Sequence, residues 1–164
     1  MIISKRLKTI AELVPNNSNV IDVGCDHALL DIYLSLEKNC TCQACDINKN
    51  ALKQAVNNIS KYNLETKIKT YLTDGLNNIT INENDIIVIA GMGTNTIKHI
   101  LNGNLSNTLI IASNNDIKEL REDQVRIIYT HISDNNYLVL GALVKKVNYD
   151  KQARETYRSI FSRR

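Results

Sequence analysis

The sequence predicts an α/β protein with a parallel sheet and helices on both faces. Short apolar, β-rich segments alternate with amphipathic segments four or five times, and most of the strand-like segments end at a glycine or an acid. The 164 residues are enough for one domain with a buried core. The hydrophobic content of 43% excludes a disordered chain, and no apolar run reaches the roughly 18 residues of a membrane helix.

The first half of the chain predicts a helix followed by two strand–helix units. Ser4 can cap the first helix, which Pro15 stops. The first strand ends at Gly24, and Asn48 can cap the helix after the second strand. The expected elements are helix 5–14, strand 19–24, helix 27–38, strand 41–46 and helix 48–59.

The second half continues this alternation. The strand that ends at Ala90 runs into Gly91-Met92-Gly93, after which a helix is expected. Residues 151–164 fit either a helical face or an edge strand, and their pattern alone leaves both open. The other expected elements are strands 67–72, 85–90 and 108–112, helices 97–101 and 116–131, and a β-rich segment over 137–147.

Four cysteines, at positions 25, 40, 42 and 45, raise the question of a metal site. On a strand, Cys42 and Cys45 point to opposite faces, because their separation is odd. No histidine flanks them, and no second pair has zinc-finger spacing. We therefore expect no metal, and small buried thiols that stay reduced in a cytoplasmic protein with no signal peptide and no membrane association.

The net charge of +3 is unevenly distributed. Residues 141–164 contain seven basic and two acidic residues, and Lys5, Arg6 and Lys8 add positive charge near the N-terminus. The stretch between them is acidic. Basic termini can bind an anionic polymer at the edge of a site built for something else, but ordinary solvated charges explain the same pattern.

The carboxyl ends of parallel strands are where such sheets bind ligands. A dinucleotide site needs Gly-x-Gly-x-x-Gly to accept a pyrophosphate, but here Asp26 replaces the second glycine after Gly24. A carboxylate in that loop suits a sulfonium or an α-ammonium group instead, and Asp22 adds a second acid. Asp46 lies where a ribose-diol acceptor belongs, and Asp74 is placed to accept from an adenine amino group. Together these acids indicate S-adenosylmethionine rather than NAD.

Several strings resemble the bacterial tRNA (adenine-22-N1)-methyltransferases of the TrmK type. Asp-His-Ala at 26–28 and Ala-Gly-Met-Gly at 90–93 are specific to that group rather than to methyltransferases at large, and the resemblance covers about residues 4–163. The family usually has Gln-Pro-Asn after strand five, where only Asn114 is retained here. The matching strings are Ser4-Lys5-Arg6-Leu7, residues 20–30, Asp74-Gly75-Leu76, residues 89–94 and 109–114, and Leu120-Arg121.

The resemblance implies a Rossmann-like class I S-adenosylmethionine-dependent methyltransferase fold. Its sheet is expected to be mostly parallel and seven-stranded, with a C-terminal antiparallel hairpin around 148–154 and a final strand over 157–162. The expected domain spans 1–164, with a helix in 1–15 leading into it and without the family's C-terminal coiled-coil domain. We therefore expect a monomer that binds the cofactor and binds tRNA only weakly.

The resemblance also implies methyl transfer to the N1 ring nitrogen of an adenine. Asp26 is expected to stabilise the positive charge that forms on the base or to take a proton from its amino group, with His27 as the second candidate. A paired adenine must be flipped out first, and Asn114 could bind its edge. Arg6 and Arg121 are candidate phosphate contacts. A salt bridge for each arginine and a helix cap for Asn114 explain these residues equally well.

The loop after strand four lacks the Asn/Asp-Pro-Pro-aromatic motif of amino-group methyltransferases, which favours a ring nitrogen as the target. A methyltransferase acting on another RNA, a protein or a small molecule stays an alternative, as does a non-catalytic cofactor-binding module. His99 and His131 lie on expected helices without a partner and are assigned no role. The residues expected to bind the cofactor are Asp22, Gly24, Cys25, Asp46, Ile47, Asp74, Gly75, Ala90, Gly91 and Met92.

Overall fold

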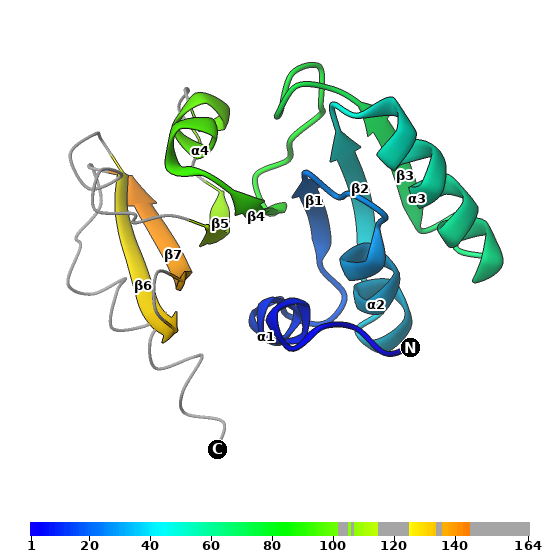
Figure 1. Ribbon diagram of the computed structural model, residues 1–164, viewed down its shortest axis with the longest axis horizontal. Coiled ribbons are helices and arrows are strands. Elements are labelled where there is room, and N and C mark those ends of the chain that lie inside the picture. The colour runs from blue at the N-terminus through cyan, green and yellow to red at the C-terminus, as the bar shows by residue number, and fades with distance from the viewer. Residues whose placement is uncertain (102–104, 106, 115–124, 134–135, 145–164) are drawn as a thin grey trace.

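The computed structural model describes residues 1–101, 105, 107–114, 125–133 and 136–144, the last two segments as backbone only. Figure 1 shows a central sheet with helices packed against it. In chain order the elements are α1 (Lys5–Leu13), β1 (Asn19–Val23), α2 (Leu29–Glu37), β2 (Thr41–Asp46), α3 (Lys49–Lys61), β3 (Ile68–Leu72), β4 (Ile86–Met92), α4 (Thr94–Ile100), β5 (Thr108–Ser113), β6 (Val125–Ser133) and β7 (Asn136–Val144).

The sheet is parallel from β3 to β5. Within the described residues its order is β3-β2-β1-β4-β5-β7-β6, and β1 lies between β2 and β4 with both pairings parallel. The chain therefore crosses over between β3 and β4, which makes the carboxyl end of β1 the switch point of the sheet. This arrangement confirms the expected Rossmann-like fold and brings five strand ends to one edge.

The C-terminal part differs from the expectation. The helix predicted over 116–131 is wrong from residue 125 onward, because β6 occupies 125–133 and pairs antiparallel with β7. Five of the nine residues in β6 are β-branched, and pairing with β7 favours the strand that this composition permits. Residues 115–124, the hairpin expected around 148–154 and the final strand over 157–162 lie outside the described residues.

Side-chain caps begin α1 and α3, and a left-handed residue precedes α2. Ser4 caps α1, its Oγ accepting from the backbone N–H of Leu7 at 3.3 Å. Asn48 caps α3, its Oδ1 accepting from two backbone N–H groups. Helix α2 begins at Leu29, two residues later than predicted, because Ala28 has a left-handed backbone with φ of 56°. The two expected caps are confirmed, and the late start of α2 leaves a longer turn after β1.

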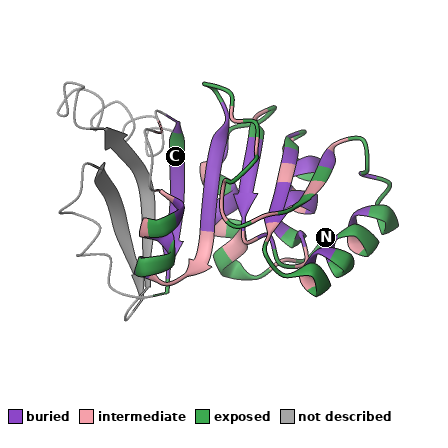
Figure 2. Cartoon of the chain, turned by 90° about the horizontal axis from the view of Figure 1, so that it is seen from above, coloured by how far each residue is buried: buried purple, intermediate pink, exposed green. Residues whose placement is uncertain are grey.

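Helices cover both faces of the sheet, as expected. Buried residues of α1, α2 and α3 form one core with Val20 of β1 and Val88 of β4. The opposite face forms a second core, in which Ile97 of α4 packs with Ile21 and Ile87. Figure 2 shows the strands largely buried, while the outer sides of the helices are exposed. None of the helices in the described segments is long and apolar enough to cross a membrane.

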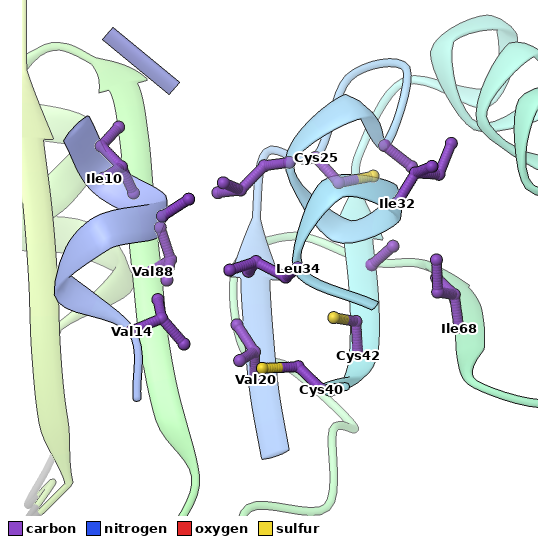
Figure 3. Close-up of a cluster of buried hydrophobic side chains, with 14 of the residues drawn as sticks. Ile10, Val14, Val20, Cys25, Ile32, Leu34, Cys40, Cys42, Ile68 and Val88 are labelled. Carbon is purple, nitrogen blue, oxygen red and sulfur yellow. The ribbon is translucent and has the colours of Figure 1, made fainter. Parts of the chain in front are cut away.

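The four cysteines are buried and free. Cys42 belongs to the core beneath α2, whereas Cys45 belongs to the core on the other face, as the strand geometry predicted. Figure 3 shows the sulfur atoms of Cys25, Cys40 and Cys42 among apolar side chains. Burial raises the pKa of the Cys42 and Cys45 thiols, that of Cys45 to about 12, so both stay protonated at neutral pH. These thiols act as small core residues.

Candidate functional site

A tight turn at the carboxyl end of β1 forms the floor of the site. The backbone N–H groups of Gly24 and Cys25 both donate to the Cys45 carbonyl, at 2.8 and 2.9 Å. Gly24 has φ of 80°, and the Met92 side chain occupies the space where a Cβ at this position would lie. The left-handed backbone is what favours glycine here, because the Met92 methyl is the end of a flexible side chain and can move aside.

A cavity of about 420 Å³ opens above this turn. Its lining combines acids, a histidine and an arginine with apolar side chains from α1 and α2. Most of the predicted site residues at the ends of β1 and β4 lie in it, together with residues that had no predicted role in binding. The lining residues are Ser4, Arg6, Leu7, Asp22, Gly24, Cys25, Asp26, His27, Leu29, Leu30, Ala90 and Gly91.

Asp26 and His27 lie together at the exposed rim of the cavity. Asp26 Oδ1 is 3.3 Å from His27 Nε2, with the Asp26 side chain 75% exposed. The Asp26 backbone has φ of 50° and donates its N–H to Asp46 Oδ2 at 2.9 Å. Asp46 Oδ1 accepts from the Asn48 N–H at 2.8 Å, so each of its oxygens keeps one lone pair for a further donor. Asp46 thus holds the turn and can still accept from a ligand hydroxyl.

Asp22 forms the buried acidic wall of the cavity and is only 4% exposed. Burial and the charges of Asp31 and Asp46 raise its pKa well above the usual value. Burial also raises the pKa of the Cys25 thiol, so Cys25 contributes no charge to this wall at neutral pH. Within the described segments Asp22 has no paired cation, and such a desolvated acid fits a ligand that carries a positive charge, which is the chemistry expected for a sulfonium or an ammonium group.

Arg6 and Asn114 form a bridge between α1 and the ends of β4 and β5. Arg6 Nη1 donates to Asn114 Oδ1 at 3.4 Å, and Asn114 Nδ2 donates to the Gly91 carbonyl at 2.7 Å. A Cβ at Gly91 would lie 2.7 Å from Arg6 Nη2, so the guanidinium rests directly over this glycine. The two predicted substrate residues within the described part are therefore in contact, whereas Arg121 lies outside it.

Other predicted cofactor residues lie outside the cavity lining. Ile47 is 69% exposed after β2, and Met92 lies under the turn against Gly24. Asp74 follows β3, and its Oδ2 is 3.6 Å from His99 Nε2. The expectation that His99 lacks a partner was therefore wrong, because α4 brings it beside the end of β3, 25 positions away in the sequence.

Sequence reasoning missed the apolar part of the lining and one buried acid. Leu29 and Leu30 line the cavity because α2 begins only at Leu29. The helical pattern of the sequence did not reveal this late start. Asp31 is fully buried on α2, and its position inside the run Leu-Leu-Asp-Ile was the available signal. Within the described segments, no cluster of three or more His, Cys, Asp or Glu residues is arranged to hold a metal.

Comparisons with known proteins agree with this geometry. A family model described as a methyltransferase domain matches residues 3–139. The tRNA (adenine(22)-N(1))-methyltransferase of Bacillus subtilis is 39% identical over 100 residues, 60% of this chain and 42% of that protein. The structure of M. capricolum TrmK with S-adenosyl-homocysteine has 32% identity and a TM-score of 0.74 over 89% of this chain and 70% of that one. The B. subtilis TrmK structure has 31% identity and a TM-score of 0.75, over 87% and 67%.

The sheet order, the acidic glycine turn and the matching family model define a Rossmann-like methyltransferase domain. Within that class, the chain belongs to the TrmK family of tRNA (adenine-22-N1)-methyltransferases. It spans 42% of the length of the curated B. subtilis relative.

Proposed function

We propose that this chain is the S-adenosylmethionine-dependent catalytic domain of a methyltransferase that modifies N1 of adenine 22 in tRNA. The observation that carries the proposal is the cavity at the switch point, where Asp22 and Asp26 lie on either side of the Gly24 turn. The names of the B. subtilis relative and of the two TrmK structures support the substrate and the position of the methyl group.

The cofactor site is proposed at the carboxyl ends of β1, β2, β3 and β4. S-adenosylmethionine, when bound, supplies the electrophilic methyl group. Asp22 would face its cationic part, and the free lone pairs of Asp46 would accept from its ribose hydroxyls. Asp74 is proposed to accept from the adenine amino group. The remaining proposed contacts are Gly24, Cys25, Ile47, Gly75, Ala90, Gly91 and Met92.

Asp26 is proposed as the catalytic residue, with His27 as its partner. Methylation leaves a positive charge on the adenine ring, and a carboxylate at the rim can stabilise that charge or take a proton from the exocyclic amine. The contact of 3.3 Å between Asp26 Oδ1 and His27 Nε2 allows the histidine to orient the carboxylate or to receive that proton.

The tRNA side of the site is proposed along Arg6, Asn114 and Arg121. Arg6 and Asn114 are already bridged at the rim, where a flipped adenine would enter. Opening that bridge frees one guanidinium for a phosphate and one amide for the base edge. We propose a cytoplasmic monomer that binds tRNA weakly and whose mostly parallel sheet ends in an antiparallel hairpin around 148–154. The strands β6 and β7, which precede that segment in the sequence, pair antiparallel with each other.

Methyl transfer onto defined transcripts tests this function. The purified chain is incubated with labelled S-adenosylmethionine and micromolar tRNA transcript, and digested nucleosides are separated by mass spectrometry. N1-methyladenosine is expected from a transcript with adenine at position 22, and none from a matched transcript with guanine there. Equal methylation of both transcripts would disprove the site specificity. Binding of the cofactor without any transfer would favour the non-catalytic alternative.

A further inference from the structure

Two carboxyl groups are buried together behind the wall of the cavity. Asp22 lies near the end of β1 and is 4% exposed, and Asp31 lies on α2 and is completely buried. Only Asp22 is part of the cavity lining. Asp31 therefore acts on the cavity through Asp22 and not by touching a ligand.

The Asp31 carboxyl lacks a partner with ordinary hydrogen-bond geometry in the described part of the chain. Both of its oxygens are buried without a partner among the described residues. The Asp22 carboxyl lies within hydrogen-bonding reach of Asp31, and two carboxyl groups can bond each other only when one of them carries a proton. The pair is stable in this core only as a proton-sharing unit, because two buried like charges would repel each other.

Among the described residues, the groups that act on the pair include no compensating cation. Asp46 on β2 adds negative charge near Asp22, and burial keeps the thiols of Cys25 and Cys42 protonated. The Cys42 Sγ donates to the backbone carbonyl of Asp31 at 3.8 Å and also contacts Ser35 Oγ. Its interaction with the Asp31 carboxyl, and that of the Asp31 backbone N–H, lower the pKa of Asp31 by less than burial raises it. Burial raises the pKa of Asp31 to about 6 and that of Asp22 well above its usual value.

Arg6 and His27 line the same cavity as Asp22, on the side of the rim. Arg6 is held by Asn114 and His27 by Asp26, so the Arg6 guanidinium and the His27 imidazole both have partners away from Asp22. The charge that Asp22 presents to the cavity is therefore governed mainly by its neighbours Asp31 and Asp46.

We propose that Asp22 and Asp31 share one proton and that Asp31 is a positioning residue that sets the charge facing the cationic part of the cofactor. This inference rests on the proposed function. With the shared proton the pair carries a single negative charge, and a second proton neutralises it. Affinity for a cationic ligand should then fall as the pH drops through the first titration of the pair.

Binding of S-adenosylmethionine as a function of pH tests the proposal. Affinity is measured by calorimetry from pH 5 to 8.5 for the wild type and for Asp31→Asn, whose amide can donate permanently to Asp22. The wild type should lose affinity at acidic pH, and in the variant the midpoint of that loss should move down by about one pH unit. Titration of the ligand itself is common to both proteins and cancels in the comparison.

Asp85→Asn is the matched control, because Asp85 is also a buried acid but lies at the start of β4, bonded to Asn82. Its pH profile should follow that of the wild type. If Asp31→Asn also follows the wild-type profile, or if Asp85→Asn shifts equally, the inference is overturned. A wild type that binds no cofactor at any pH would instead refute the proposed function.

Carbon-13 NMR of the aspartate carboxyls in the free protein tests the pair without any ligand. The Asp22 resonance should titrate at lower pH in Asp31→Asn than in the wild type. An unchanged Asp22 titration would disprove the shared proton even if the protein binds cofactor normally. Asp31→Ser, whose hydroxyl group is a small donor, is the second variant if the Asp31→Asn protein does not fold.

Discussion

The turn after β1 concentrates unusual backbone geometry at the residues proposed to act. Gly24, Asp26 and Ala28 all have positive φ, between 50° and 80°. A non-glycine residue in this region costs about 1–3 kcal/mol, and such strain persists where the surrounding structure holds it. Here the backbone bonds to Cys45 and the contact with Asp46 hold the turn. Each substitution in the turn must therefore be chosen so that it does not add strain.

Asp26→Asn is the appropriate test of catalysis, because asparagine tolerates positive φ and has the same shape. Loss of the carboxylate should lower kcat by roughly 10²–10⁴-fold, with the KM for tRNA little changed. Single-turnover methyl transfer measures the effect, and His27→Gln is expected to have the smaller one. A variant with undiminished kcat would contradict the assignment of Asp26.

Asp31→Asn should also change how stability depends on pH. An acid whose pKa is raised by folding destabilises the folded state above its unfolded pKa, near 3.9. For Asp31 the penalty grows from there and is complete above its folded pKa of about 6. The free energy of unfolding is measured with urea at pH 4.5 and 7.5. Relative to the wild type, that of the variant should rise by on the order of 2–3 kcal/mol from the lower to the higher pH. A constant difference would contradict the raised pKa.

At the scale of elements, α1 brings the N-terminal residues to the site. Ser4 caps its start, and the Lys38 ammonium, at the end of α2, binds the carbonyls of Ala11 and Val14 at its end. Ile10 anchors the helix in the core. Because both ends of α1 are held, Arg6 can reach Gly91 and Asn114 across the sheet.

Lys38→Met should weaken this attachment. Two carbonyls lose a charged donor while the methionine retains most of the apolar stem, so the loss in stability should be about 1.5–3 kcal/mol. Denaturant unfolding measures it, and Lys61→Met, at the exposed end of α3, should change stability by less than about 0.5 kcal/mol. Equal effects of the two substitutions would show that Lys38 does not hold α1.

At the scale of the whole molecule, the two faces of the sheet differ in function. The face beneath α1, α2 and α3 contains Asp22 and Asp31, whereas α4 covers a hydrophobic core that includes Ile97. The overall charge is +3, although the site at the sheet edge is acidic. Under the proposed function, a cationic cofactor and an anionic tRNA would be attracted to different parts of one chain.

This separation predicts different salt dependences. If phosphate contacts hold the tRNA, the affinity for tRNA should fall steeply when the salt rises from 50 to 200 mM. The loss should be about tenfold or more for every few phosphate contacts. Cofactor binding in a partly buried cavity should change by less than about threefold. Filter binding and calorimetry at matched salt measure the two. A tRNA affinity that is insensitive to salt would contradict a role for Arg6 in binding phosphate.

The fold and the floor of the site could be predicted because they depend on local patterns. Period-two and helical patterns located the parallel strands and the first helices, and Gly24 marked the switch point. The helix predicted over 116–131 was wrong from residue 125 onward because the β6 segment pairs with β7, and pairing partners are not visible in local propensity. The apolar lining was missed because it depends on where α2 begins.

The sequence by itself determined which chemistry is present: Asp22, Asp26 and Asp46 follow strand ends, and the Asp-His-Ala and Ala-Gly-Met-Gly strings indicate the family. Only the tertiary structure decided which groups meet. It joined Arg6 to Asn114, His99 to Asp74 and Asp31 to Asp22, pairs that come from different elements. The protonation of an acid such as Asp31 depends on its burial and on the charges that it contacts. Both depend on packing across the sheet.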